Sequence, residues 1–113
     1  MRKESEIQKE ILNYLEFHPD FFAFRHNVYK PQMRKKFRAS KSDSGIADII
    51  CCYRGGKYVE IEVKTKLGKQ SENQKEHEKK IELLGGRYFL ISNILELEEM
   101  ITQLYRENNV VVI

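Results

Sequence analysis

Several features are scarce in this chain, and each absence narrows what it can be. No run of about 18 apolar residues occurs, so no segment has the length of a transmembrane helix. The basic first residues lead into further charges and not into an apolar stretch, which is unlike a secretory signal. Tryptophan is absent, but six phenylalanines and six tyrosines can fill a core. We therefore expect a single cytosolic domain that spans residues 1–113.

Cysteine is also scarce, and its two copies, Cys51 and Cys52, are adjacent. Neighbouring residues on a strand point to opposite faces, so we expect no disulfide between them. No second cysteine pair and no nearby histidine completes a zinc site. We interpret both as buried thiols of a strand.

The charge is unevenly distributed, although the formal net charge is only +3. Six basic residues fall within twelve positions that contain no acid: Lys30, Arg34, Lys35, Lys36, Arg38 and Lys41. Such a stretch indicates contact with a polyanion such as DNA, through phosphate contacts that depend on salt. The alternative is a solvated surface run without a partner.

Hydrophobic periodicity and turn residues divide the chain into eight elements. Ser71 and Gln74 have the spacing of a capping box, and Ser92 is the expected cap of the last helix. The order α-β-β-β-α-β-α-β predicts an α/β fold, a mixed sheet flanked by helices. The predicted helices are 3–17, 71–84 and 92–107, and the predicted strands are 21–29, 46–53, 58–64, 87–91 and 110–113.

The two central strands form a predicted hairpin around Gly55 and Gly56. Asp48 interrupts an apolar run, and we expect it inside its strand. A turn centred on Gly55 places residue 48 opposite residue 62, whereas a turn centred between the two glycines places it opposite residue 63. In either register Asp48 and Glu62 are cross-strand neighbours, roughly 5 to 7 Å apart at Cβ.

In the second strand of the hairpin, 58–64, successive side chains point to opposite faces, which places Glu62 and Lys64 on one face. Two neighbouring carboxylates repel each other unless a positive charge lies between them, and Mg²⁺ is commonly held by one or two carboxylates. Lys64 could then orient a water, stabilise a transition state or act as a general base. The alternative is an ordinary Glu–Lys ion pair on a solvated face. Glu60 shares this face nearer the turn, and we interpret it as peripheral.

The order of these residues resembles a known motif. Residues 45–48 (Gly-Ile-Ala-Asp), then thirteen residues, then 62–64 (Glu-Val-Lys) are similar to the PD-(D/E)XK nuclease motif. The stretch 65–74 and the Glu4–Gln8 pair resemble the VRR-NUC (virus-type replication-repair nuclease) branch. That family often has proline at the position of Ala47.

The resemblance implies a restriction-endonuclease-like αβββαβ core and a DNA endonuclease that uses Mg²⁺ or Mn²⁺. It suggests branched DNA, such as Holliday junctions or flaps, as substrate in replication or repair. It also implies an active-site role for Gln74 and a homodimer, to which the apolar end 110–113 could contribute. The Val63 carbonyl is a further candidate metal ligand.

Helical geometry selects a third carboxylate. At 100° per residue, Glu4 lies on the stripe that continues to Ile7 and Ile11, whereas Glu6 lies on the opposite side. We therefore expect Glu4 to join the metal site. The alternative is that Glu4 is only a favourable acid in the first turn of a helix.

Two other functions remain open from the sequence. One is a nucleic-acid-binding module that keeps the fold without cleavage and binds through residues 30–41. The other is a structural or assembly protein whose charges are solvated. For His18 and His77 we expect surface positions.

Overall fold

A computed structural model describes residues 2–26 and 45–109 of the chain. The helices and strands expected in these ranges are confirmed, with small shifts at their ends. The end of the first predicted strand (27–29), the basic residues of 30–41 and the predicted strand 110–113 lie outside the described residues. The elements are α1 (Glu4–Glu16), β1 (Phe21–Arg25), β2 (Ile49–Tyr53), η3 (Arg54–Gly56), β3 (Lys57–Val63), α2 (Glu72–Leu83), β4 (Arg87–Ile91) and α3 (Ile94–Glu107).

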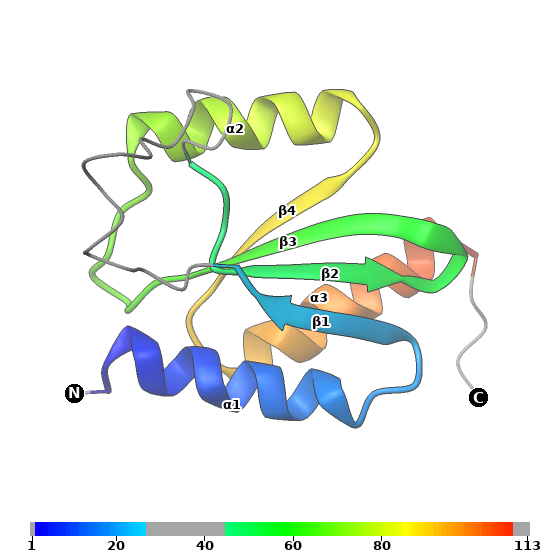
Figure 1. Cartoon of the computed structure of the whole chain (residues 1–113), viewed down its shortest axis with the longest axis horizontal. Helices are drawn as coiled ribbons and strands as arrows, with labels where there is room; N and C mark the ends of the chain where they lie inside the picture. The colour runs from blue at the N-terminus through cyan, green and yellow to red at the C-terminus, as the bar shows by residue number, and fades with distance from the viewer. Residues whose placement is uncertain (1, 27–44, 110–113) are drawn as a thin grey trace, which may run out of the picture.

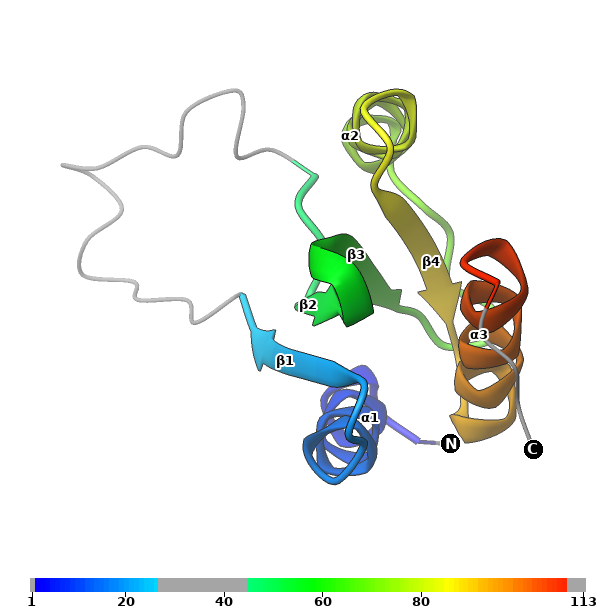
Figure 2. The ribbon, with the colours of Figure 1, turned by 90° about the vertical axis from the view of Figure 1, so that its right-hand side faces the viewer.

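The strands form one mixed sheet in the order β1-β2-β3-β4 (Figure 1). The first three strands are antiparallel, and β4 lies parallel to β3, which it reaches through the crossover helix α2. Helix α2 lies on one side of the sheet, and α1 and α3 lie on the other (Figure 2). This arrangement confirms the predicted mixed sheet flanked by helices.

The β2–β3 hairpin has the first of the two predicted registers. Ile49 pairs with Ile61 and Tyr53 with Lys57, so the turn centres on Gly55. Gly55 and Gly56 have φ values of 77° and 81°, a backbone region that favours glycine. Continued by one residue, this register places Asp48 opposite Glu62.

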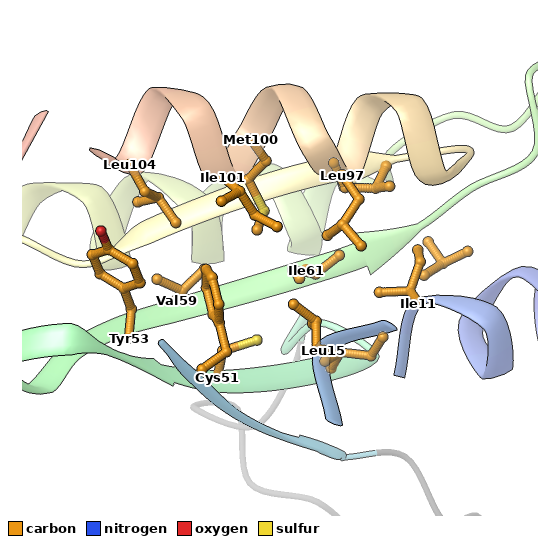
Figure 3. Packing of buried hydrophobic residues seen from close by; sticks show 14 of the residues in the cluster. Ile11, Leu15, Cys51, Tyr53, Val59, Ile61, Leu97, Met100, Ile101 and Leu104 are labelled. Carbon is orange, nitrogen blue, oxygen red and sulfur yellow. The ribbon is translucent and has the colours of Figure 1, made fainter. Parts of the chain in front are cut away.

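The apolar core lies between the sheet and the two helices α1 and α3 (Figure 3). Alternate residues of β2 and β3 point into it, as the two-residue period of a strand requires. Helices α1 and α3 contribute apolar residues at three- and four-residue spacings. The completely buried members are Ile11, Leu15, Ile49, Val59, Ile61, Val63, Leu97 and Leu104.

The opposite face of β3 is buried as well, but it carries charge. Glu60 and Glu62 are 0% and 4% exposed, and each contacts a side chain of α2. None of the residues of α2, all of which are described, is fully buried. Helix α2 therefore covers the sheet through polar contacts, whereas α1 and α3 cover it through apolar ones.

Three local predictions were wrong. Asp48 lies just before β2 and not within it. Its side chain accepts the hydrogen bond from the Val63 amide that a backbone carbonyl would accept if the strand continued. The cap of α3 is Asn93, whose side chain accepts from the Glu96 amide, while Ser92 donates its amide to the Glu96 carboxylate. Cys51 is buried, but Cys52 is exposed, because Cys52 lies on the face of the sheet away from α1 and α3.

None of the helices in residues 2–26 and 45–109 is long and apolar enough to cross a bilayer.

Candidate active site at the ends of β2 and β3

Asp48 and Glu62 meet where β2 begins and β3 ends. Asp48 Oδ2 accepts a hydrogen bond of 3.0 Å from the Val63 amide, which fixes its carboxylate against the end of β3. The Asp48 carbonyl in turn accepts a 2.8 Å hydrogen bond from the His26 amide, beyond the end of β1. Two segments that are distant from it in sequence therefore hold Asp48.

The two oxygens of the Glu62 carboxylate differ in their hydrogen bonding. Its Oε2 accepts a 2.9 Å hydrogen bond from Gln74 Nε2 and lies 3.5 Å from Lys64 Nζ. Its Oε1 is buried and receives no hydrogen bond from any described residue. Leaving a buried carboxylate oxygen without a partner is costly, so this atom is suited to a positive ligand.

Burial also changes the acidity of Glu62. Desolvation, together with the negative charge of Asp48, raises its pKa to about 7. Lys64 and the Gln74 amide act in the opposite direction, because both favour the charged form. In the absence of a cation, Glu62 therefore titrates near neutral pH.

This raised pKa predicts a stability that depends on pH. The folded state binds the Glu62 proton more tightly than the unfolded state, so the contribution of Glu62 is full below pH 4.5 and is lost as the pH rises through about 7. We expect urea unfolding in EDTA to show a loss of up to about 3 kcal/mol from Glu62 between pH 5 and pH 8. Glu62→Gln should remove this component of the slope, and saturating Mn²⁺ should reduce it in the wild type. An unchanged slope in Glu62→Gln would contradict the assignment.

Gln74 forms the capping box that its spacing from Ser71 predicted, and it also contacts Glu62, while its active-site role stays a prediction. Its amide N–H donates to Ser71 Oγ at 3.1 Å, and its Oε1 accepts from the Ser71 amide at 2.9 Å, which completes the capping box. Its Nε2 is left free to donate to Glu62. The start of α2 and the orientation of Glu62 therefore depend on the same side chain.

The donor atoms of Asp48 and Glu62 are compatible with a divalent cation. Two carboxylates and one unpartnered buried oxygen are a suitable donor set for Mg²⁺, which keeps several waters and often takes few protein ligands. Within the described ranges, however, no group of three His, Cys, Asp or Glu side chains is close enough to hold a metal. Glu4, half-buried in the first turn of α1, is not brought into a group with Asp48 and Glu62. Its role as a ligand stays a prediction.

Three residues are less exposed or less peripheral than the sequence predicted, and two of them, Glu60 and His77, lie next to the candidate site. Glu60, interpreted as peripheral, is completely buried and contacts both His77 and Tyr58. His77, expected on the surface, has a side chain only 11% exposed. His77 follows Gln74 by three residues, so helical spacing could have placed it on the same face. His18 was also expected on the surface, but its ring packs edge-on to Phe21, with centroids 5.1 Å apart.

Comparisons with known proteins identify the fold. A solved structure described as "VRR_NUC domain" matches with a TM-score of 0.62 and 17% identity, over 90% of this chain and 97% of that chain. Another, described as "VRR_NUC domain protein", matches with a TM-score of 0.63 and 18% identity, over 91% and 88% of the two chains. No family model matches the sequence, and no curated protein matches it either.

The chain therefore has the α/β fold of VRR_NUC domains. The family resemblance drawn from residues 45–74 is confirmed at the level of the fold.

Proposed function

We propose that this protein is a nuclease that hydrolyses phosphodiester bonds in DNA with the help of Mg²⁺ or Mn²⁺. The observation that carries the proposal is the juxtaposition of Asp48 with Glu62, whose Oε1 is buried without a hydrogen-bond donor among the described residues. Lys64 beside them supplies a positive charge. The shared fold with VRR_NUC domains supports the same conclusion.

Each residue has a distinct task in this proposal. Asp48 and Glu62 would hold the cation, and the Val63 carbonyl and Glu4 are further candidate ligands. When bound, the cation lowers the pKa of a coordinated water and neutralises charge on the phosphate. Lys64 places its ammonium group where it can orient the attacking water or stabilise negative charge on the phosphate. Gln74 holds the Glu62 carboxylate in one orientation.

The proposed substrate is branched DNA, such as Holliday junctions or flaps in replication or repair. This proposal is drawn from the resemblance of residues 45–74 to the VRR-NUC branch, and binding would use Lys30, Arg34, Lys35, Lys36, Arg38 and Lys41. A homodimer would provide two sites for the two strands of a junction, because the proposed active site occurs once per chain.

Cleavage of labelled four-way-junction, flap and linear duplex DNA in Mg²⁺, Mn²⁺ or EDTA tests the function. We expect metal-dependent cutting that falls about 100-fold or more in Lys64→Ala, since a charge aimed at the reacting phosphate is lost. Lys79→Ala, an exposed lysine on α2, is the matched control and should cut at the wild-type rate. Equal cutting by Lys64→Ala and the wild type would exclude the proposed role of Lys64.

A second candidate function is a nucleic-acid-binding module without cleavage. It is favoured by one observation, namely that no third metal-binding side chain joins Asp48 and Glu62 within the described residues. The same experiment separates the two functions. DNA binding that weakens with salt, without cutting in either metal, would identify the binding module.

A further inference from the structure

Glu60 is a second buried carboxylate, one strand repeat from Glu62 on the same face of β3. Its Oε1 accepts a 3.0 Å hydrogen bond from the Ala47 amide. His77 Nε2 lies 2.9 Å from both carboxylate oxygens, and the Tyr58 hydroxyl donates to Oε2. A carboxylate with 0% exposure is tolerated only when its oxygens are satisfied in this way.

The Ala47 contact connects Glu60 to the candidate active site. Ala47 is itself completely buried and directly precedes Asp48. The β2–β3 pairing ends at Ile49, so the backbone that leads into Asp48 has left the strand. At this point two side chains replace the backbone hydrogen bonds of a strand: Glu60 accepts from the Ala47 amide, and Asp48 accepts from the Val63 amide.

Helix α2 supports both carboxylates from above. Gln74 and His77 are three residues apart and therefore face the same side of the helix. Gln74 donates to Glu62, and His77 contacts Glu60. The first turn of the helix also packs against Gly45, where an added Cβ would lie 2.4 Å from the Asn73 carbonyl oxygen. The segment 45–48 is thus held between α2 and β3.

We propose that Glu60, held in place by His77, is a positioning residue for Asp48. Glu60 fixes the backbone directly before Asp48, and in this way it sets the separation of the Asp48 and Glu62 carboxylates. This inference rests on the proposed function only where it concerns the cation. If Glu60 merely anchored α2 to the sheet, its loss would leave the Asp48 carboxylate in place against Val63.

Two substitutions separate the hydrogen bond from the volume of the side chain. Glu60→Met has a similar shape but cannot accept the Ala47 amide, whereas Glu60→Gln keeps one carbonyl oxygen for it. Glu82→Met is the matched control, because Glu82 accepts the Tyr88 amide at 2.7 Å from the other end of α2. Amide hydrogen exchange at Val63 reports whether Asp48 stays in position, and titration with Mn²⁺ alone reports on the site.

We expect Glu60→Met to accelerate exchange at Val63 and to weaken Mn²⁺ binding, each by about 10-fold or more, as for loss of a residue that orients a metal ligand. Glu60→Gln should stay within about three-fold of the wild type, and Glu82→Met should match the wild type in both measurements. Should Glu60→Met fail to fold, His77→Phe keeps a ring but removes the partner of Glu60. That variant should accelerate exchange at Val63 by about five-fold.

The two measurements also separate this inference from the proposed function. Unchanged exchange at Val63 in Glu60→Met, or an equal acceleration in Glu82→Met, would overturn the positioning role. A wild type that binds no Mn²⁺ would contradict the metal site, and the exchange measurement alone would then decide the role of Glu60.

Discussion

Asp48→Asn should abolish DNA cleavage and, at the same time, make the protein more stable to heat. Asparagine keeps a side-chain oxygen that can accept the Val63 amide, so the local structure is preserved. It removes the negative charge that, together with burial, raises the pKa of Glu62. We expect the cleavage rate to fall on the order of 1,000-fold, because the proposed cation loses a charged ligand. Relief of the repulsion is worth about 1 kcal/mol, or about 4 °C in melting temperature.

The two effects are measured separately, by cleavage in Mn²⁺ and by thermal unfolding in EDTA at pH 7.5. Asp20→Asn is the matched control, because Asp20 accepts the Tyr105 hydroxyl at 2.6 Å at the opposite end of β1. That variant should lose some stability, because it removes the ion pair of Asp20 with Arg54, and it should cut at the wild-type rate. An Asp48→Asn protein that melts at a lower temperature would show that the two carboxylates do not strain the fold.

Gly45→Ala should be among the most destabilising single changes in the chain. Gly45 has a φ of +86°, and an added Cβ would lie 2.4 Å from the Asn73 oxygen and 2.8 Å from the Asn73 carbonyl carbon. Both are backbone atoms of the first turn of α2, so the helix itself must move. We expect a loss of about 4 kcal/mol in the free energy of unfolding, measured with urea, from the unfavourable φ and the clash together.

Gly85→Ala separates these two causes. Gly85 has a similar φ of +95°, but nothing lies within 4 Å of an added Cβ, so only the backbone term remains. We expect it to cost about 1 kcal/mol. Because α2 carries Gln74 and His77, Gly45→Ala should also reduce cleavage about 10-fold, while Gly85→Ala should not. Equal losses of stability in the two variants would show that the start of α2 adapts without cost.

The sequence by itself determined the parts of the candidate site that depend on local geometry. The two-residue period of β3 placed Glu62 and Lys64 on one face, and they are 3.5 Å apart. The glycine pair limited the hairpin to two registers, one of which is observed. The spacing of Ser71 and Gln74 predicted a capping box, which is present. Each of these relationships is fixed by a few consecutive residues or by one tight turn.

Only the tertiary structure decided which helix residues contact which strand residues. The contact of Glu60 with His77 depends on how α2 packs on β3, which no spacing along the chain specifies. The same is true of Cys52, which is exposed because the helices that bury Cys51 lie on the other face of the sheet. The position of Glu4 depends on the rotation of α1, which the packing of Ile7, Ile11 and Leu15 sets. Periodicity determines which side of a helix or strand a residue occupies. The neighbours of that side depend on how the helices pack on the sheet, and this packing is a sum of many weak contacts between segments that are distant in sequence.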